Sequence, residues 1–130
     1  MSDIIEVPIS RIEKISVERV EDLIVGAFEG GSNYWYSADI QRNEDNQKTE
    51  YYKLPFIEGC SITIWDAQDN TPTLNGTPKF ILDKDAIEKG LKIMAKRYDW
   101  HFKNFIDEND DSTTADAFLQ CCVFGDIIFG

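Results

Sequence analysis

Glu29-Gly30-Gly31-Ser32-Asn33-Tyr34-Trp35-Tyr36 is the stretch at which a predicted helix gives way to a predicted strand. Before it, apolar residues recur at helical spacing from Val17 to Phe28, and two glycines directly after such a pattern are typical of a left-handed helix stop. After it, Tyr34 to Arg42 alternates between aromatic or apolar and polar residues, which indicates a strand. The stretch therefore sets the order helix, turn and strand in the first third of the chain.

The remaining elements are expected from the same two periodicities. A helix is expected after each of three polar N-cap residues, namely Ser16, Asp83 and Thr113. The second helix is expected to continue to Phe105 as the longest element, and Gly125 is expected to stop the third. Further extended segments are expected at 4–9, 49–54, 60–65 and 77–82, and the apolar segment 127–129 is expected to be a last strand or an anchor on the core. These elements predict an α+β fold in which an antiparallel sheet of about four to five strands packs against three helices.

Length and composition indicate an ordinary globular protein. At 130 residues, with 42% hydrophobic and 28% charged residues, the chain is expected to form a single domain over 1–130. No apolar run approaches the roughly 20 residues that span a bilayer, and the acidic start Met1-Ser2-Asp3 is unlike a signal peptide, so we expect a cytoplasmic protein with no membrane partner. The odd number of cysteines, two of them adjacent, favours reduced thiols.

The net charge of −11 argues against direct nucleic-acid binding, because neutralising phosphates needs an excess of Lys and Arg. The charge is not uniform. The segment from Lys84 to Lys103 contains six basic residues and three acidic ones. This basic stripe would suit a small anionic ligand, whereas the acidic remainder would suit a DNA-like surface that occupies a partner's basic groove.

The glycine-rich turn and the aromatics after it are the first candidate site. Backbone amides across Gly30, Gly31, Ser32 and Asn33 could form an anion-binding nest, and an aromatic ring could stack on a planar base. The alternative is a helix C-cap with a turn, which also explains both glycines. In a strand, Tyr34 and Tyr36 share one face and Trp35 takes the other, so at least one ring is expected in the core.

The second candidate is the one histidine, His101, with Arg97 four residues earlier on the same predicted helix face. Guanidinium and imidazole, with Lys103 close by, could clamp a phosphate. The alternative is a surface histidine on a charged helix. A single histidine is too few for the ligand set of a zinc hydrolase. The acidic run Asp107 to Asp111 resembles the start of a calcium-binding loop but lacks the later residues of that loop. We therefore expect no catalytic residues, no metal and no cofactor, and a protein that is not an enzyme.

Four segments carry a resemblance to a family of small proteins of tailed phages and prophages. The resemblance as a whole covers most of the chain. The segments are 24–35, with Glu-Gly-Gly-Ser-Asn-Tyr-Trp; His101-Phe102; 108–111, with Glu-Asn-Asp-Asp; and 116–125, with Asp-Ala-Phe-Leu-Gln-Cys-Cys-Val-Phe-Gly. The resemblance carries no specific chemistry. It implies non-catalytic interference with host defence in the cytoplasm of an infected bacterium.

The resemblance implies two competing hypotheses, and nothing in the sequence excludes a third. In the first, which the localised aromatic and glycine-rich features favour, the protein sequesters a nucleotide-type immune signal. The base of the nucleotide would then stack on Trp35 or Tyr34, and the glycine-rich turn would bind its polar groups. Its phosphate would be bound by Arg97, His101 or Lys103. In the second, the protein is an acidic, DNA-mimic-like inhibitor of a host nuclease, CRISPR or restriction complex, acting through clusters such as Glu44-Asp45 and 107–111. In the third, it is a phage accessory protein. A homo-oligomer that completes the pocket is compatible with the first.

Overall fold

The structure is a computed structural model that describes residues 4–8, 12–67 and 78–130. It confirms the α+β class, but the strands form two antiparallel sheets rather than one. The smaller sheet is a hairpin of β1 (Ile4–Pro8) and β2 (Ile12–Ser16). The larger sheet has the order β3-β4-β5 and is built from β3 (Tyr36–Gln41), β4 (Ser61–Asp66) and β5 (Lys79–Leu82). The expectation of a single sheet is wrong because β1 pairs with β2 alone.

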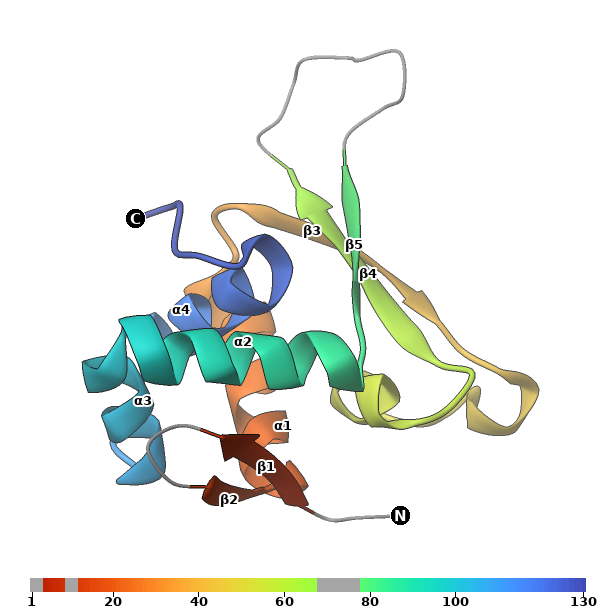
Figure 1. Ribbon diagram of the computed structural model, residues 1–130. Coiled ribbons are helices and arrows are strands. Elements are labelled where there is room, and N and C mark those ends of the chain that lie inside the picture. The colour runs from red at the N-terminus through yellow and green to blue at the C-terminus, as the bar shows by residue number, and fades with distance from the viewer. Residues whose placement is uncertain (1–3, 9–11, 68–77) are drawn as a thin grey trace.

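The helical elements follow and connect these strands. They are α1 (Val17–Gly26), the π-helical turn η1 (Ala27–Gly31), the 3-10 turns η2 (Glu44–Asn46) and η3 (Tyr51–Phe56), α2 (Lys84–Arg97), α3 (Asp99–Ile106) and α4 (Ser112–Phe124). Figure 1 shows α2 running across the molecule against α4, with the β1–β2 hairpin on one side and the three-stranded sheet projecting on the other. None of these helices has the length and apolar character needed to cross a bilayer.

Two predicted helix starts and one stop are confirmed. The Ser16 side chain accepts a hydrogen bond from the backbone N–H of Arg19 at 3.2 Å, and the Asp83 side chain accepts one from Ala86 at 2.9 Å. Gly125 ends α4 in the left-handed conformation, with φ of 75°, which favours glycine. These local signals worked because each depends only on residues within one turn.

The predicted start of the third helix at Thr113 is wrong by two residues. The N-cap is Asp111, whose carboxylate accepts a hydrogen bond from the Thr114 N–H at 3.0 Å. The long helix after Asp83 is also interrupted. Tyr98 leaves helical geometry with φ of −131° and ψ of 57°, and its hydroxyl donates to Asp126. That contact helps to hold the break between α2 and α3.

Two further expectations fail around the larger sheet. Residues 49–54 do not form a return strand, since β4 takes the place beside β3, with Gln41 paired to Ser61, and η3 forms instead. Gly30 and Gly31 are not a left-handed stop either, because neither has a positive φ. The helix instead widens into the η1 turn. Two ends of expected strands, Ile9 and Thr77, lie outside the described residues.

The inner face of the larger sheet determines where a site can form. Cross-strand neighbours share a face, so Ala38 lies beside Ile64 and Ile40 beside Ile62. Ile62 and Ile64 are buried in the main hydrophobic core, together with residues of all four α-helices. Ile40, on the outer strand β3, is 42% exposed. The inner face is therefore covered at its centre and open along β3.

Candidate functional site

The predicted glycine-rich turn folds around one carboxylate, that of Asp116. Its Oδ1 accepts hydrogen bonds from the Ser32 hydroxyl at 2.7 Å and from Trp35 Nε1 at 2.8 Å. Its Oδ2 accepts from the Tyr34 hydroxyl at 2.6 Å and from Gln120 Nε2 at 3.1 Å. Asp116 and Gln120 are four residues apart on α4 and so face the same way. Four donors thus satisfy a buried carboxylate, as burial of a charge requires.

The Trp35 ring is part of the core. It has no exposed surface, and it stacks on Phe129 with ring centres 5.7 Å apart and an interplanar angle of 26°. Gln120 holds the tail in place, because its Oε1 accepts hydrogen bonds from the backbone N–H groups of Ile128 and Phe129, each at 2.8 Å. The segment 127–129 is therefore an anchor and not a strand. Base stacking on Trp35, one of the two options in the first hypothesis, does not fit this packing.

Tyr34 lies at the surface over the same cluster, with 46% of its side chain exposed. Its ring meets Phe129 edge-on, at 6.4 Å between centres. Partial burial, together with the hydrogen bond to Asp116, raises the pKa of Tyr34 to about 12. The phenol therefore stays protonated at neutral pH and remains a hydrogen-bond donor to Asp116.

In the turn before these aromatics, backbone N–H groups donate hydrogen bonds to carbonyl groups of the same segment. The Ser32 N–H donates to the Ala27 carbonyl at 2.9 Å, and the Asn33 N–H donates to Gly30 at 3.4 Å. Gly31 allows η1 to approach α4, since a Cβ there would lie 2.1 Å from the Ser112 carbonyl oxygen. This geometry supports a structural turn rather than an anion-binding nest.

The predicted phosphate clamp is spread along the molecule. His101, on α3, has Nδ1 3.4 Å from the Thr114 hydroxyl, near the start of α4, and burial lowers the pKa of its imidazole. Arg97 is exposed at the end of α2, with Nη1 3.8 Å from Asp126, beyond the end of α4. Thr114 and Asp126 lie near opposite ends of α4, which is about 20 Å long at 1.5 Å per residue. Lys103 is exposed on α3. Arg97 and His101 therefore contact residues near opposite ends of α4.

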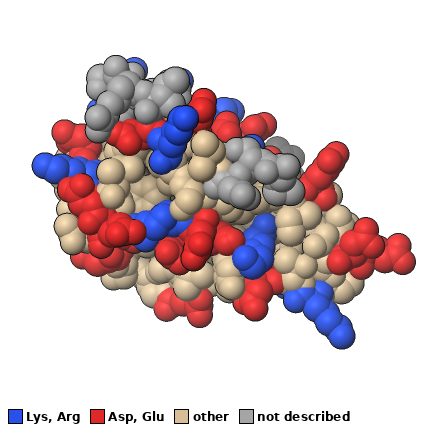
Figure 2. Space-filling view, turned by 90° about the horizontal axis from the view of Figure 1, so that it is seen from below, with Lys and Arg blue, Asp and Glu red and all other residues tan. Residues whose placement is uncertain are grey.

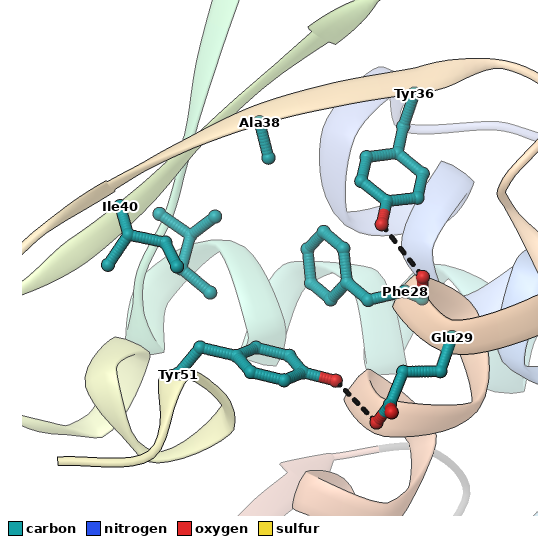
Figure 3. Close-up of a pocket in the computed structure, with 7 residues that line it drawn as sticks. Phe28, Glu29, Tyr36, Ala38, Ile40 and Tyr51 are labelled. Carbon is teal, nitrogen blue, oxygen red and sulfur yellow. Dashed lines mark hydrogen bonds between the residues drawn. The ribbon is translucent and has the colours of Figure 1, made fainter.

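A different part of the molecule offers an open cavity, which we call the aromatic hollow. It has a volume of about 310 Å³ and lies where the uncovered inner face of β3 meets η1 and η3 (Figure 3). The Phe28 ring is nearly perpendicular to two others, at 81° and 4.8 Å from Tyr36 and at 89° and 5.7 Å from Tyr51. The lining residues are Phe28, Glu29, Tyr36, Ala38, Ile40, Tyr51 and Ile62.

The polar groups of the aromatic hollow are two phenols and one carboxylate. The Tyr51 hydroxyl donates to Glu29 Oε2 at 2.8 Å, and the Tyr36 hydroxyl donates to the Phe28 carbonyl at 2.7 Å (Figure 3). Burial raises the pKa of Tyr51 and of Tyr36, and the nearby Glu29 carboxylate adds to both shifts. Both phenols are therefore neutral donors. Among the lining residues, all within the described chain, Glu29 is the one charged side chain.

Glu29 also belongs to a second depression, which we call the acidic groove. It has a volume of about 480 Å³ and is lined by Glu18, Glu21, Asp22, Val25, Glu29, Tyr52 and Lys53. The Lys53 ammonium is 3.1 Å from Glu21 Oε1 and lies 5.4 Å from the centre of the Tyr52 ring. Figure 2 shows that Asp and Glu outnumber Lys and Arg over the face of the molecule seen from below. The groove thus has four carboxylates, of which Glu21 pairs with Lys53 and Asp22 pairs with Arg19 at 3.3 Å.

Sequence reasoning missed both depressions, although part of the signal was present. The alternation Tyr36, Ala38, Ile40 correctly predicted one shared face of the strand. The sequence pattern predicts a strand at Tyr51 and gives no basis for its contact with Glu29. Of the acidic clusters in the second hypothesis, Glu44-Asp45 lies in η2, whereas Asp110 pairs with Arg19 and Asp111 caps α4. Those last two carboxylates have structural partners.

Comparison with known proteins gives no match among protein-family models, among curated proteins or among solved structures. The hollow and the groove share Glu29. Together they present aromatic and aliphatic surface beside carboxylates. This combination suits a ligand that has an apolar part and a positive charge.

Proposed function

We propose that this protein is a non-catalytic binding protein that docks a basic surface of a partner protein onto the acidic groove and the adjoining aromatic hollow. One observation carries the proposal: the two depressions meet at Glu29 and together present four carboxylates, while their one basic side chain, Lys53, is paired with Glu21. A basic partner would restore charge balance in the groove.

Electrostatic and aromatic features have separate roles in this proposal. The net charge of −11 would steer a basic partner towards the protein and speed association. Tyrosines such as Tyr51 and Tyr52, at the two depressions, are the kind of side chain that supplies much of the affinity in protein interfaces. Charge would thus govern the encounter, and the rings would hold the complex.

The same geometry favours a protein partner over a nucleotide. A phosphate needs nearby cationic donors, and the carboxylates of the groove would repel it. The residues of the nucleotide hypothesis are used differently, since Ser32 and Trp35 donate to Asp116. With the resemblance to tailed-phage proteins, the proposed partner class is a host defence nuclease, CRISPR or restriction complex.

The test is capture of partners from a bacterial host lysate at low and high salt with two variants of equal charge. Glu18→Gln with Asp22→Asn removes two carboxylates from the groove. Glu44→Gln with Asp45→Asn removes two exposed carboxylates in η2, which line neither depression. We expect salt-sensitive capture of a basic protein that the first variant loses and the second keeps.

Two results would contradict the proposal. If both variants lost the partner to the same extent, diffuse charge rather than the groove would be responsible. If the protein instead depleted a nucleotide from solution and released it intact on heat denaturation, the nucleotide hypothesis would replace this one. An altered nucleotide product would point to an enzyme.

A further inference from the structure

We propose that the aromatic hollow is a receptor for one basic side chain, Lys or Arg, that projects from the partner. The inference rests on the proposed function, because the partner's basic surface supplies that side chain. It goes further by naming what enters the hollow and which residues hold it: Phe28, Tyr36, Tyr51 and Glu29.

The arrangement of the rings is the first argument. Phe28 stands nearly perpendicular to both Tyr36 and Tyr51, so the three rings form walls that meet at an angle (Figure 3). All three rings line the hollow, and the faces of aromatic rings attract cations. The tyrosine hydroxyls are engaged with the Phe28 carbonyl and with Glu29, which fixes how the two rings are turned.

The position of the carboxylate is the second argument. Glu29 lies at the edge of the hollow, and the hydrogen bond from Tyr51 holds its Oε2 there at 2.8 Å. An ammonium or guanidinium group near this carboxylate would gain a charge-assisted hydrogen bond, which is stronger than a neutral one. No Lys or Arg is among the lining residues, so a basic group of the protein itself does not occupy this position within the described chain.

The shape and the apolar surface give the third argument. Ala38, Ile40 and Ile62 line the hollow beside the rings, and Ile40 remains 42% exposed. The aliphatic stem of Lys or Arg packs well on such surface while its charged end reaches a polar group. A volume of about 310 Å³ is at the small end of ligand sites, which suits one side chain.

The test uses small probes that mimic these side chains. Butylguanidinium and butylammonium are titrated into the protein and followed by NMR chemical shifts of Glu29 and Tyr51. Butylurea serves as the neutral analogue of butylguanidinium, and AMP serves as an anionic probe. We expect the two cations to shift signals of the lining residues, with affinity about tenfold higher than that of butylurea, and AMP to leave them unchanged. The cation that binds with the higher affinity indicates whether the partner supplies Lys, which butylammonium mimics, or Arg, which butylguanidinium mimics.

Three variants separate charge from ring. Glu29→Gln keeps the side-chain shape and should lower cation affinity towards that of butylurea, with the remainder supplied by the rings, whereas the control Glu44→Gln should leave it unchanged. Tyr51→Phe and Tyr51→Leu both lose the hydroxyl, but only Tyr51→Leu loses the ring, so it should bind the cations more weakly than Tyr51→Phe. Unfolding curves establish that each variant is folded before its affinity is read.

The outcomes distinguish this inference from the proposed function. Equal binding of butylurea and butylguanidinium, binding of AMP in the hollow, or no shift with any probe would overturn the receptor. If partner capture still depended on Glu18 and Asp22, the proposed function would stand without it. Selective cation binding without a groove-dependent partner would leave the receptor intact and contradict the proposed function instead.

Discussion

The Ser32 hydroxyl donates a hydrogen bond of 2.7 Å to the Asp116 carboxylate, 84 positions further along the chain. Trp35 donates to the same oxygen at 2.8 Å, so a buried carboxylate on α4 fixes the turn between η1 and β3. The two sequence segments with the most distinctive motifs, 29–36 and 116–125, thus meet in one polar cluster. This contact explains both motifs without a ligand.

Replacing Asp116 is expected to destabilise the fold. Asp116→Ala leaves the buried Ser32 hydroxyl and the Trp35 N–H without their acceptor, which should lower the free energy of unfolding by about 2 to 4 kcal/mol. Asp116→Asn retains one oxygen as an acceptor and should lower it by less. Urea denaturation measures both values, and an Asp116→Ala variant within 0.5 kcal/mol of the parent would contradict the role assigned to this cluster.

The adjacent glycines Gly30 and Gly31 provide a matched pair. In Gly31→Ala the new Cβ would lie 2.1 Å from the Ser112 carbonyl oxygen, a backbone atom, so the start of α4 or η1 has to move. We expect a loss of about 1 to 3 kcal/mol. A Cβ at Gly30 meets nothing within 4 Å, and the backbone φ there is not positive, so Gly30→Ala should be neutral or slightly stabilising. Similar melting temperatures for the two variants would be incompatible with the close approach at Gly31.

His101 gives a prediction for pH. Burial lowers the pKa of its imidazole below the usual value of about 6.5, and this outweighs the opposing attraction of Asp111. As the pH falls below 6.5, the unfolded chain takes up a proton at this position more readily than the folded protein does, so the free energy of unfolding decreases. His101→Gln lacks this contribution. As the pH is lowered from 7.5 to 5.5, the free energy of unfolding of His101→Gln should rise relative to that of the parent. A difference between variant and parent that stays constant with pH would show that His101 is not responsible.

The thiols of Cys121 and Cys122 should be inert in the folded protein. Burial raises the pKa of Cys121 to about 12 and that of Cys122 well above its usual value. In a Cys60→Ser background, a disulfide reagent at pH 8 should therefore react slowly with native protein and quickly after addition of urea. Rapid labelling of native protein would mean that α4 is less well packed than described.

Local sequence signals predicted two helix starts, one helix stop and most strands. The N-caps Ser16 and Asp83 and the stop at Gly125 are confirmed, because each depends on hydrogen bonds or backbone geometry within a few residues. The break at Tyr98 has no such signal. Neither glycine nor proline marks it, and the Tyr98 hydroxyl reaches Asp126, 28 positions away.

Long-range contacts also explain why the candidate site could not be predicted. Residues 49–54 have strand-like composition, but β4 already pairs with β3, so this segment turns as η3 and brings Tyr51 to Glu29. The aromatic hollow needs residues from η1, β3, η3 and β4 at once. Only the shared face of Tyr36, Ala38 and Ile40 followed from alternation along one strand.

Photo-crosslinking from two isoleucines tests the central claim most directly. Ile40 lines the aromatic hollow, whereas Ile81, similarly exposed, pairs with Thr63 and so lies on the opposite face of the same sheet. Benzoylphenylalanine at position 40 is predicted to crosslink a partner through a segment rich in Lys and Arg, and at position 81 to give little product. Equal crosslinking from both positions, or a partner segment without basic residues, would contradict docking of a basic surface at the hollow.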